Sequence, residues 1–104
     1  MPVYNKLVRD NIPNILQEKG KGYVGKTAEN KEEFFVKLKE KLQEEVGEFL
    51  ETPCAEEIAD IQEVLDALAF SIGSDVAEVA TIKEEKAANR GRFYTGYILW
   101  SVED

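Results

Sequence analysis

The chain has 104 residues, a formal net charge of −8 and a sequence pI of about 4.6, with one cysteine and no histidine. This excess of negative charge disfavours general binding to nucleic acids or anionic membranes, which requires basic patches. The absence of histidine excludes Ser-His-Asp triads, Glu-x-x-His di-iron sites and ordinary zinc sites, so any metal ion must be held by oxygen ligands.

The length favours a single domain over residues 1–104. No apolar run approaches the roughly 18 residues of a membrane span, and the opening MPVYNKLVRD has no apolar signal-peptide core. We therefore expect a cytoplasmic protein without membrane association. The single cysteine, Cys54, cannot form an internal disulfide and has no base or second thiol beside it, so we expect no role for it.

A first short helix is expected over 11–19, with Asp10 or Asn11 as its cap and Gly20 at its end. The stretch GKGYVGKTAEN, residues 20–30, is typical of a loop because it is rich in glycine and lysine.

Asn30 followed by Glu33 indicates a capping box, and the second helix should run from there to about Glu51. Apolar residues at helical spacing give this helix one hydrophobic face, formed by Phe34, Phe35, Leu38, Leu42, Val46 and Phe49.

Thr52 and Pro53 indicate a turn and restart, with Thr52 as cap and Pro53 at the first position of a third helix that runs to about Ile72. Ser74 should cap a fourth helix that ends near Arg90.

Residues 92–103, RFYTGYILWSVE, predict a short strand or extended segment because they are β-branched and aromatic with partial alternation. The short connections between the helices predict an all-α, antiparallel, four-helix-bundle-like fold.

Carboxylates fall on the apolar faces of the second and third helices when the residues are placed at about 100° intervals. Glu45 lies inside the apolar arc of the second helix and Glu48 at its border, with Glu44 further out. Glu57 lies inside the arc of the third helix and Asp60 at its edge. The acidic residues that should point away from the hairpin are Glu56, Glu63 and Asp66.

A hairpin folded about residues 52–53 places Glu48 level with Glu57, and Glu45 level with Asp60. Four carboxylates then meet between two helices, which is unfavourable without a cation because mutual repulsion and desolvation add. Mg²⁺ is the first expectation for such an oxygen site, and Mn²⁺ is possible. The alternatives are two solvated acidic faces with a shifted helix phase, a structural Ca²⁺, or a lysine supplied by a partner.

Five basic residues are candidates for binding the phosphates of a ligand. Lys83 and Arg90 fall within the apolar stripe of the fourth helix, and Lys86 lies beside it. Lys6 and Arg9 lie near the N-terminus. The alternative for the fourth helix is that its long side chains extend past the stripe to water.

With these residues in place, the sequence resembles the all-α nucleoside triphosphate pyrophosphohydrolases, the MazG-like group that includes phosphoribosyl-ATP pyrophosphohydrolase. The family motif, Glu-Glu-x-x-Glu followed on the next helix by Glu-x-x-Asp, is matched by EEVGE (44–48) and EIAD (57–60). YNKLVRDNIP (4–13) and KEEKAANRGRF (83–93) resemble the two ends of the small phosphoribosyl-ATP-pyrophosphohydrolase-like branch.

The resemblance implies a MazG-type fold and a Mg²⁺-dependent hydrolase. This enzyme would cleave a nucleoside triphosphate, or a phosphoribosyl-ATP-like nucleotide, between its α and β phosphates. It implies Glu45, Glu48, Glu57 and Asp60 as metal ligands, and Glu44 as an auxiliary ligand or a water-orienting base. It also implies association through the helices, and the wide apolar arcs of the second and third helices agree with a homodimer or a dimer of dimers.

Two other functions remain open from the sequence. One is a non-catalytic helical interaction module, whose apolar stripes would form a dimer seam and whose acids would be solvated. The other is a regulator that binds nucleotide and metal without turnover. The placement of Glu45 and Glu57 on apolar faces argues against the first, and nothing in the sequence separates the enzyme from the regulator.

Overall fold

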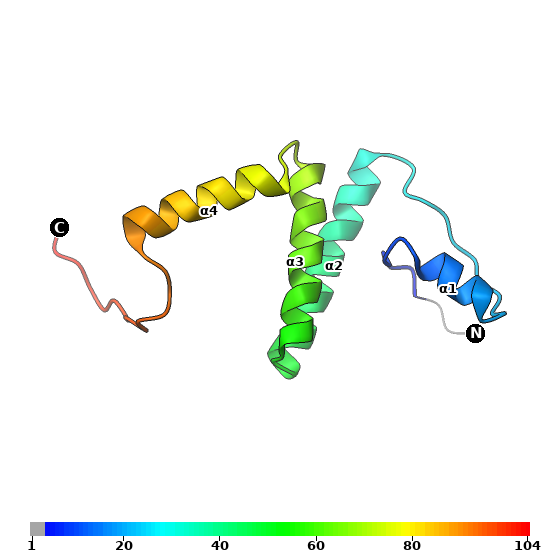
Figure 1. Ribbon diagram of the computed structural model, residues 1–104, viewed down its shortest axis with the longest axis horizontal. Coiled ribbons are helices and arrows are strands. Elements are labelled where there is room, and N and C mark those ends of the chain that lie inside the picture. Colours follow the sequence, from blue (N-terminus) through cyan, green and yellow to red (C-terminus); the bar gives the residue numbers. More distant parts are fainter. Residues whose placement is uncertain (1–3) are drawn as a thin grey trace.

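The computed structural model describes residues 4–104, and this part of the chain contains four helices and no strand. The helices, in chain order, are α1 (Ile12–Glu18), α2 (Lys31–Glu51), α3 (Ala55–Ser71) and α4 (Val76–Arg90). The all-α class predicted from the sequence is therefore confirmed. Figure 1 shows α2 and α3 side by side at the centre, with α4 extending to one side and the N-terminal segment with α1 to the other.

The N-terminus of α2 is capped by a side chain, which ends the preceding loop. The side chain of Asn30 accepts a hydrogen bond of 2.8 Å from the backbone N–H of Glu33. The Glu33 carboxylate accepts one of 2.9 Å from the backbone N–H of Glu29, whereas a standard capping box would return it to Asn30. The predicted cap at Asn30 is confirmed, and the return bond falls one residue earlier.

Two predicted helix starts were one or two residues too early. Cys54, with an extended backbone, is the N-cap of α3, so Pro53 lies in the turn and Thr52 does not cap the helix. Asp75 caps α4 by accepting a 2.7 Å hydrogen bond from the N–H of Glu78. Ser74 lies just beyond α3, and its N–H satisfies one of the last carbonyls of that helix by donating to Ala69 at 2.9 Å.

The principal packing in the molecule is the antiparallel α2–α3 hairpin, which the three-residue turn 52–54 makes possible. Among the described residues, the buried hydrophobic side chains are Leu38 of α2, 2% exposed, and Ala69 of α3, 6% exposed. The remaining apolar residues of the two helices are half-buried or exposed. This hairpin therefore has a seam of apolar contacts rather than a closed core.

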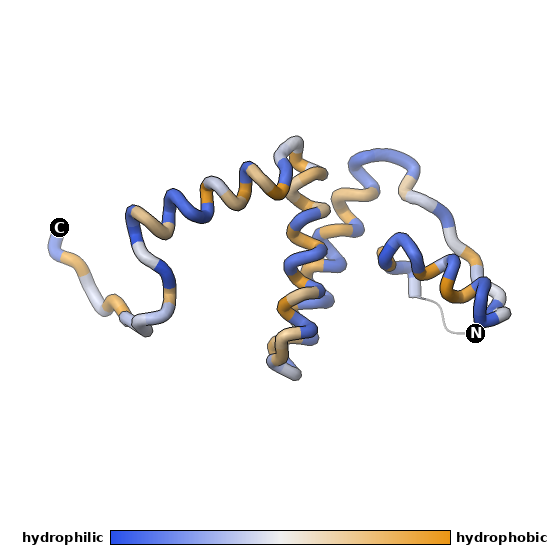
Figure 2. The backbone as a smooth tube through the Cα atoms, in the orientation of Figure 1, coloured by the Kyte–Doolittle hydropathy of each residue, from blue (hydrophilic) through white to orange (hydrophobic). Residues whose placement is uncertain are grey.

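The bundle is not closed within one chain. Within residues 4–104, the pairs of helices in close contact are α2 with α3 and, at their junction, α3 with α4. The radius of gyration is 18.2 Å and the extents are 61 × 31 × 25 Å, whereas a compact domain of about 100 residues has a radius of about 13 Å. Figure 2 shows hydrophobic positions along α4 and the C-terminal segment that no other element covers.

Residues 91–104 follow α4 as an extended segment without helix or strand, which agrees with the extended alternative predicted for this region. Gly91, with φ of +83°, redirects the chain at the end of α4. The aromatic side chains of Tyr94, Tyr97 and Trp100 are almost fully exposed.

None of the helices in residues 4–104 is at once long enough and apolar enough to span a membrane.

Candidate metal centre

Three carboxylates meet where α2 and α3 pack together. Glu45 comes from α2, and Glu57 and Asp60 come from the first turns of α3; each offers an oxygen within 4.8 Å of those of the other two. Glu45 is only 7% exposed, and the other two are half-buried. The prediction that these side chains point into the hairpin, from their positions on the apolar arcs, agrees with this geometry.

Two oxygens of this cluster lack any partner within the described chain. Glu45 Oε2 and Glu57 Oε2 are both buried and neither accepts a hydrogen bond. A buried polar atom without a partner costs about 1–3 kcal/mol, and a charged one costs more. A cation held between the two carboxylates would satisfy both oxygens, so the arrangement fits a metal site better than a solvated acidic surface.

The donor set and its spacing also fit a hard divalent ion. All three donors are carboxylates, which suit Mg²⁺, Mn²⁺ or Ca²⁺. Mg²⁺ binds oxygen at about 2.1 Å, so adjacent ligands of one ion lie about 3.0 Å apart; the three carboxylates, whose oxygens lie within 4.8 Å of one another, would move closer together around a bound ion. The residues that would hold the ion are Glu45, Glu57 and Asp60.

Glu48, predicted as a fourth ligand, lies outside this three-carboxylate group. Its side chain is exposed, because it starts from the border of the apolar arc of α2, where the surface of the hairpin already meets water. It is still a neighbour of Glu45, one helical turn away, and its charge affects that residue.

The pKa of Glu45 is raised above its ordinary value of 4.5, and burial is the largest cause. The neighbouring Glu48 adds to the rise, because like charges disfavour ionisation. Lys41 opposes it, with its ammonium 3.3 Å from Glu45 Oε1. The native state therefore keeps an ionised Glu45 at a cost that a divalent ion would remove.

Lys6 and Arg9, both predicted as phosphate-binding residues, lie beside the carboxylates. Lys6 Nζ donates to Glu44 Oε1 at 2.9 Å, and Arg9 Nη2 donates to Asp60 Oδ1 at 2.7 Å. The hydrogen bond between Lys6 and Glu44 lowers the pKa of the carboxyl and raises that of the ammonium. Both cations are within reach of a ligand that enters next to the cluster.

Lys41 belongs to the site but was missed in the sequence. It contacts Glu44 Oε2 and Glu45 Oε1, both at 3.3 Å, and its side chain is 15% exposed. The signal was present, since Lys41 precedes Glu44 by three residues and Glu45 by four, a spacing that joins side chains on one helix face.

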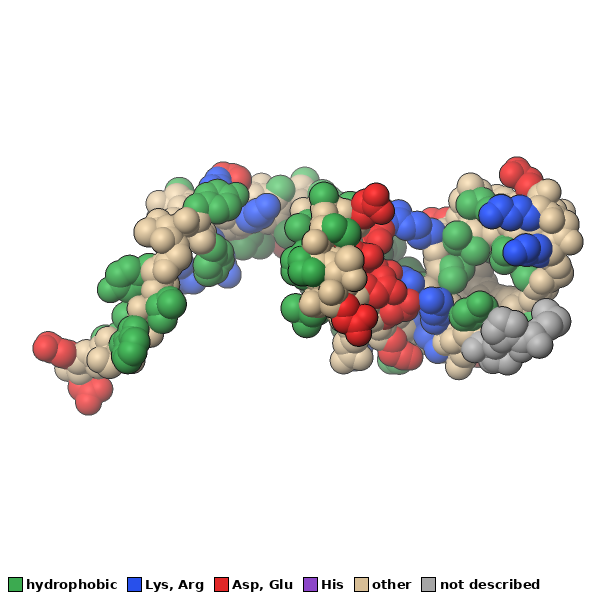
Figure 3. Space-filling view, turned by 90° about the horizontal axis from the view of Figure 1, so that it is seen from below, with side chains coloured by type: hydrophobic (Ala, Val, Ile, Leu, Met, Phe, Trp, Pro, Cys, Tyr) green, Lys and Arg blue, Asp and Glu red, His purple; other side chains and the backbone are tan. Residues whose placement is uncertain are grey.

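A cleft of about 380 Å³ opens beside the carboxylates, between residues 7–11 and the α2–α3 hairpin. Apolar side chains form much of its wall, namely Leu7, Val8, Phe34, Leu38, Val64 and Ala67. Its polar residues are Arg9, Asp10, Asn11, Lys41, Glu45, Asp60 and Glu63. Glu63 is exposed, in agreement with the prediction that it points away from the hairpin, and it borders the cleft on the side of the N-terminal segment. Figure 3 shows acidic side chains on the hairpin facing this segment, with basic side chains between them.

The basic residues of α4 are not brought to this cluster within one chain. α4 contacts α3 only near their junction, whereas Glu57 and Asp60 lie at the opposite end of α3 (Figure 1). Lys83, Lys86 and Arg90 are all exposed, and the stripe on which two of them lie faces water. Their contact with a phosphate stays a prediction.

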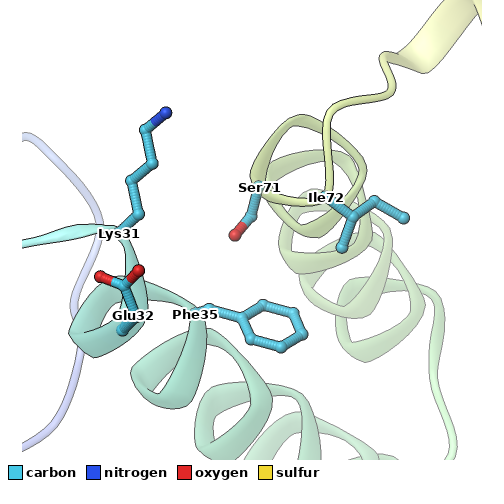
Figure 4. Close-up of a pocket in the computed structure, with 5 residues that line it drawn as sticks. All are labelled: Lys31, Glu32, Phe35, Ser71 and Ile72. Atoms are coloured by element: carbon cyan, nitrogen blue, oxygen red, sulfur yellow. The ribbon is translucent and has the colours of Figure 1, made fainter.

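A second, shallower hollow of about 290 Å³ lies at the other end of the hairpin, between the start of α2 and the end of α3 (Figure 4). Its lining residues are Lys31, Glu32, Phe35, Ser71 and Ile72. The Phe35 ring points toward α3, whereas the Lys31 ammonium points away. With a single carboxylate in its lining, this hollow lacks the chemistry of the first cleft.

Comparisons with models of known protein families, with curated proteins and with solved structures found no match for this chain. The case for a function therefore depends on the chemistry of the carboxylates, the cations and the cleft.

Proposed function

We propose that the protein is a Mg²⁺-dependent nucleotide pyrophosphohydrolase. It would cleave the anhydride between the α and β phosphates of a nucleoside triphosphate, or of a phosphoribosyl-ATP-like nucleotide, and release a monophosphate and pyrophosphate. The observation that carries this proposal is the pair of buried, unpartnered oxygens on Glu45 and Glu57, which lie next to Asp60 at the edge of a cleft. The resemblance of EEVGE and EIAD to the motifs of that enzyme class supplies the reaction.

The electrostatics of the site suit a highly charged phosphate ester. When bound, Mg²⁺ neutralises phosphate oxygens and lowers the pKa of an attacking water. Lys6 and Arg9 lie beside the carboxylates, where they can contact the phosphates that extend beyond the ion. Positioning and charge neutralisation dominate phosphoryl chemistry, so the absence of histidine from the chain is no obstacle.

Glu44 is held ionised beside the carboxylate cluster by two lysines. Its hydrogen bond with Lys6 lowers its pKa, which makes it a weaker base, and it also contacts Lys41. Of the two roles implied for Glu44, an auxiliary metal ligand or a water-orienting base, the lowered pKa is compatible with both, since an ionised carboxylate can bind a metal ion or accept a hydrogen bond from water.

The volume and the lining of the cleft favour a nucleotide over inorganic phosphate as the ligand. Its volume of about 380 Å³ and its partly apolar wall offer room beside the carboxylates for a planar, weakly polar group such as a nucleobase. Phe34 provides an aromatic side chain in that wall. A site for inorganic phosphate alone would need no such wall.

A helical interaction module is the second candidate, and the many exposed large hydrophobic side chains favour it. One assay separates the two. Purified protein is incubated with Mg²⁺ and a panel of standard and modified nucleoside triphosphates, and the products are resolved chromatographically. We expect monophosphate and pyrophosphate in equal amounts. Release of orthophosphate would contradict cleavage between the α and β phosphates. No hydrolysis of any nucleotide would contradict the enzyme and leave the interaction module or the nucleotide-binding regulator.

A further inference from the structure

The N-terminal segment, residues 5–11, is joined to α2 and α3 by cationic side chains. Three contacts hold it: Lys37 Nζ donates to the Asn5 carbonyl at 3.0 Å, Lys6 Nζ to Glu44 at 2.9 Å, and Arg9 Nη2 to Asp60 at 2.7 Å. Within the described residues, α1 packs against no other helix, so nothing rigid fixes the segment from behind. These charged contacts hold the segment in place together with the half-buried Leu7 in the wall of the cleft.

Arg9 pairs with a carboxylate that the metal site also needs. Asp60 gives one oxygen to the Arg9 guanidinium and belongs to the cluster with Glu45 and Glu57. A divalent ion held by this cluster would lie close to the guanidinium, and the two positive charges repel each other. The Arg9 side chain is 59% exposed, so it can leave Asp60 without unpacking.

We propose that residues 5–11 form a latch whose Arg9 neutralises Asp60 in the metal-free protein and moves to the phosphate of the bound nucleotide once a divalent ion holds the carboxylates. This inference rests on the proposed function and deepens it, because it makes Arg9 the competitor of the ion and the partner of the substrate. The planar guanidinium suits both positions, since it pairs with carboxylate and phosphate oxygens through the same two-pronged geometry.

The latch predicts that Arg9→Gln changes two affinities, for metal ion and for phosphate, in opposite directions. Isothermal titration calorimetry can measure both without an activity assay. Mn²⁺ alone should bind the variant more tightly than the wild type, by about two- to fivefold, which corresponds to the loss of one exposed ion pair. Inorganic triphosphate, titrated into protein saturated with Mn²⁺, should bind the variant at least threefold more weakly. The first effect should shrink as salt concentration rises.

Arg92→Gln is the matched control, because Arg92 forms an exposed ion pair with Glu84 at 2.9 Å on α4, away from the cleft. It should change neither affinity. Circular dichroism should show an unchanged fold for both variants.

The outcomes separate this latch from the function on which it rests. If the wild type binds no Mn²⁺, the proposed function fails and the latch fails with it. If the wild type binds Mn²⁺ but Arg9→Gln matches Arg92→Gln, or shifts both affinities in the same direction, the latch alone is overturned. Failure of triphosphate to bind the Mn²⁺-loaded wild type would likewise overturn the transfer of Arg9 to phosphate.

Discussion

The Glu45 carboxylate is the least exposed charged group in the described part of the chain, and it strains the native state. It is 7% exposed, one of its oxygens has no partner, and its neighbour Glu48 carries the same charge. Lys41 compensates at 3.3 Å, but only on the other oxygen. Removing the charge while keeping the shape of the side chain should therefore stabilise the native state of the metal-free protein.

Glu45→Gln should raise the free energy of unfolding of the metal-free protein at neutral pH, with a pH dependence of defined sign. Because the folded-state pKa of Glu45 is raised above 4.5, the native protein binds more protons than the unfolded chain between those two values. The free energy of unfolding of the wild type therefore falls as pH rises from 4.5 to the raised pKa. The advantage of the variant should be absent near pH 4.5 and constant above the raised pKa.

Urea denaturation of both proteins in the presence of a chelator, at a series of pH values, checks this prediction. Glu56→Gln, an exposed change on the neighbouring helix, is the control and should stay within about 0.5 kcal/mol of the wild type at every pH. A Glu45→Gln advantage that does not vary with pH would show that the carboxylate is not the cause.

The direction of side chains well inside the apolar arcs of the hairpin was predictable from the sequence. A helical wheel fixes the direction of a side chain to within some tens of degrees, which suffices for Glu45 and Glu57 inside their apolar arcs. It does not suffice for Glu48 at a border, where a small rotation decides between interface and water. The outward direction of Glu63 was predictable, but its position at the edge of a cleft was not, because the segment that forms the other wall is distant in sequence.

At the scale of helices, the central residues of each helix were predicted better than its first and last residues. The apolar period runs through a whole helix, whereas a boundary depends on one or two hydrogen bonds. The α3–α4 junction is an example: Ser74 and Asp75 are both good caps by residue type. The Ser74 N–H donates to the Ala69 carbonyl at the end of α3. Asp75 caps α4 by accepting a hydrogen bond from the N–H of Glu78.

Asp75→Ala should therefore destabilise the first turn of α4 by about 1 kcal/mol, the usual cost of losing an N-cap side chain. Ser74→Ala should have little effect, because its side chain caps nothing in the described structure. Since α4 packs only at its junction with α3, the loss should appear locally, as fraying of residues 76–79. NMR secondary chemical shifts measure this directly, and a larger effect from Ser74→Ala would refute the assignment of the cap.

At the scale of the whole molecule, one chain leaves too much apolar surface in water. Only two hydrophobic side chains are buried among the described residues, and large ones such as Phe70, 75% exposed, lie on the surface of α3. The sequence predicted four helices but could not show that the chain fails to close them into a bundle. That outcome depends on how the helices are oriented at their junctions, which local patterns do not specify.

We expect the protein to form a homodimer or a dimer of dimers that covers these surfaces. Phe70→Asp should shift it toward the monomer and lower its melting temperature, because a charge would be placed in the interface. Gln62→Asp, at an exposed polar position of the same helix, is the control and should do neither. Sedimentation equilibrium that finds only an 11.8 kDa species for the wild type at micromolar concentration would contradict this expectation.

The most direct test of the metal centre is the melting temperature with and without Mg²⁺ across a set of variants. Mg²⁺ at about 100 times its Kd should stabilise the wild type by roughly 2.7 kcal/mol. The variants expected to lose this stabilisation are Glu45→Gln, Glu57→Gln and Asp60→Asn. The exposed changes expected to keep it are Glu56→Gln and Asp66→Asn. If the wild type gains no stability from Mg²⁺, or if the exposed changes abolish the gain as the three cluster changes do, the three carboxylates are not a metal centre.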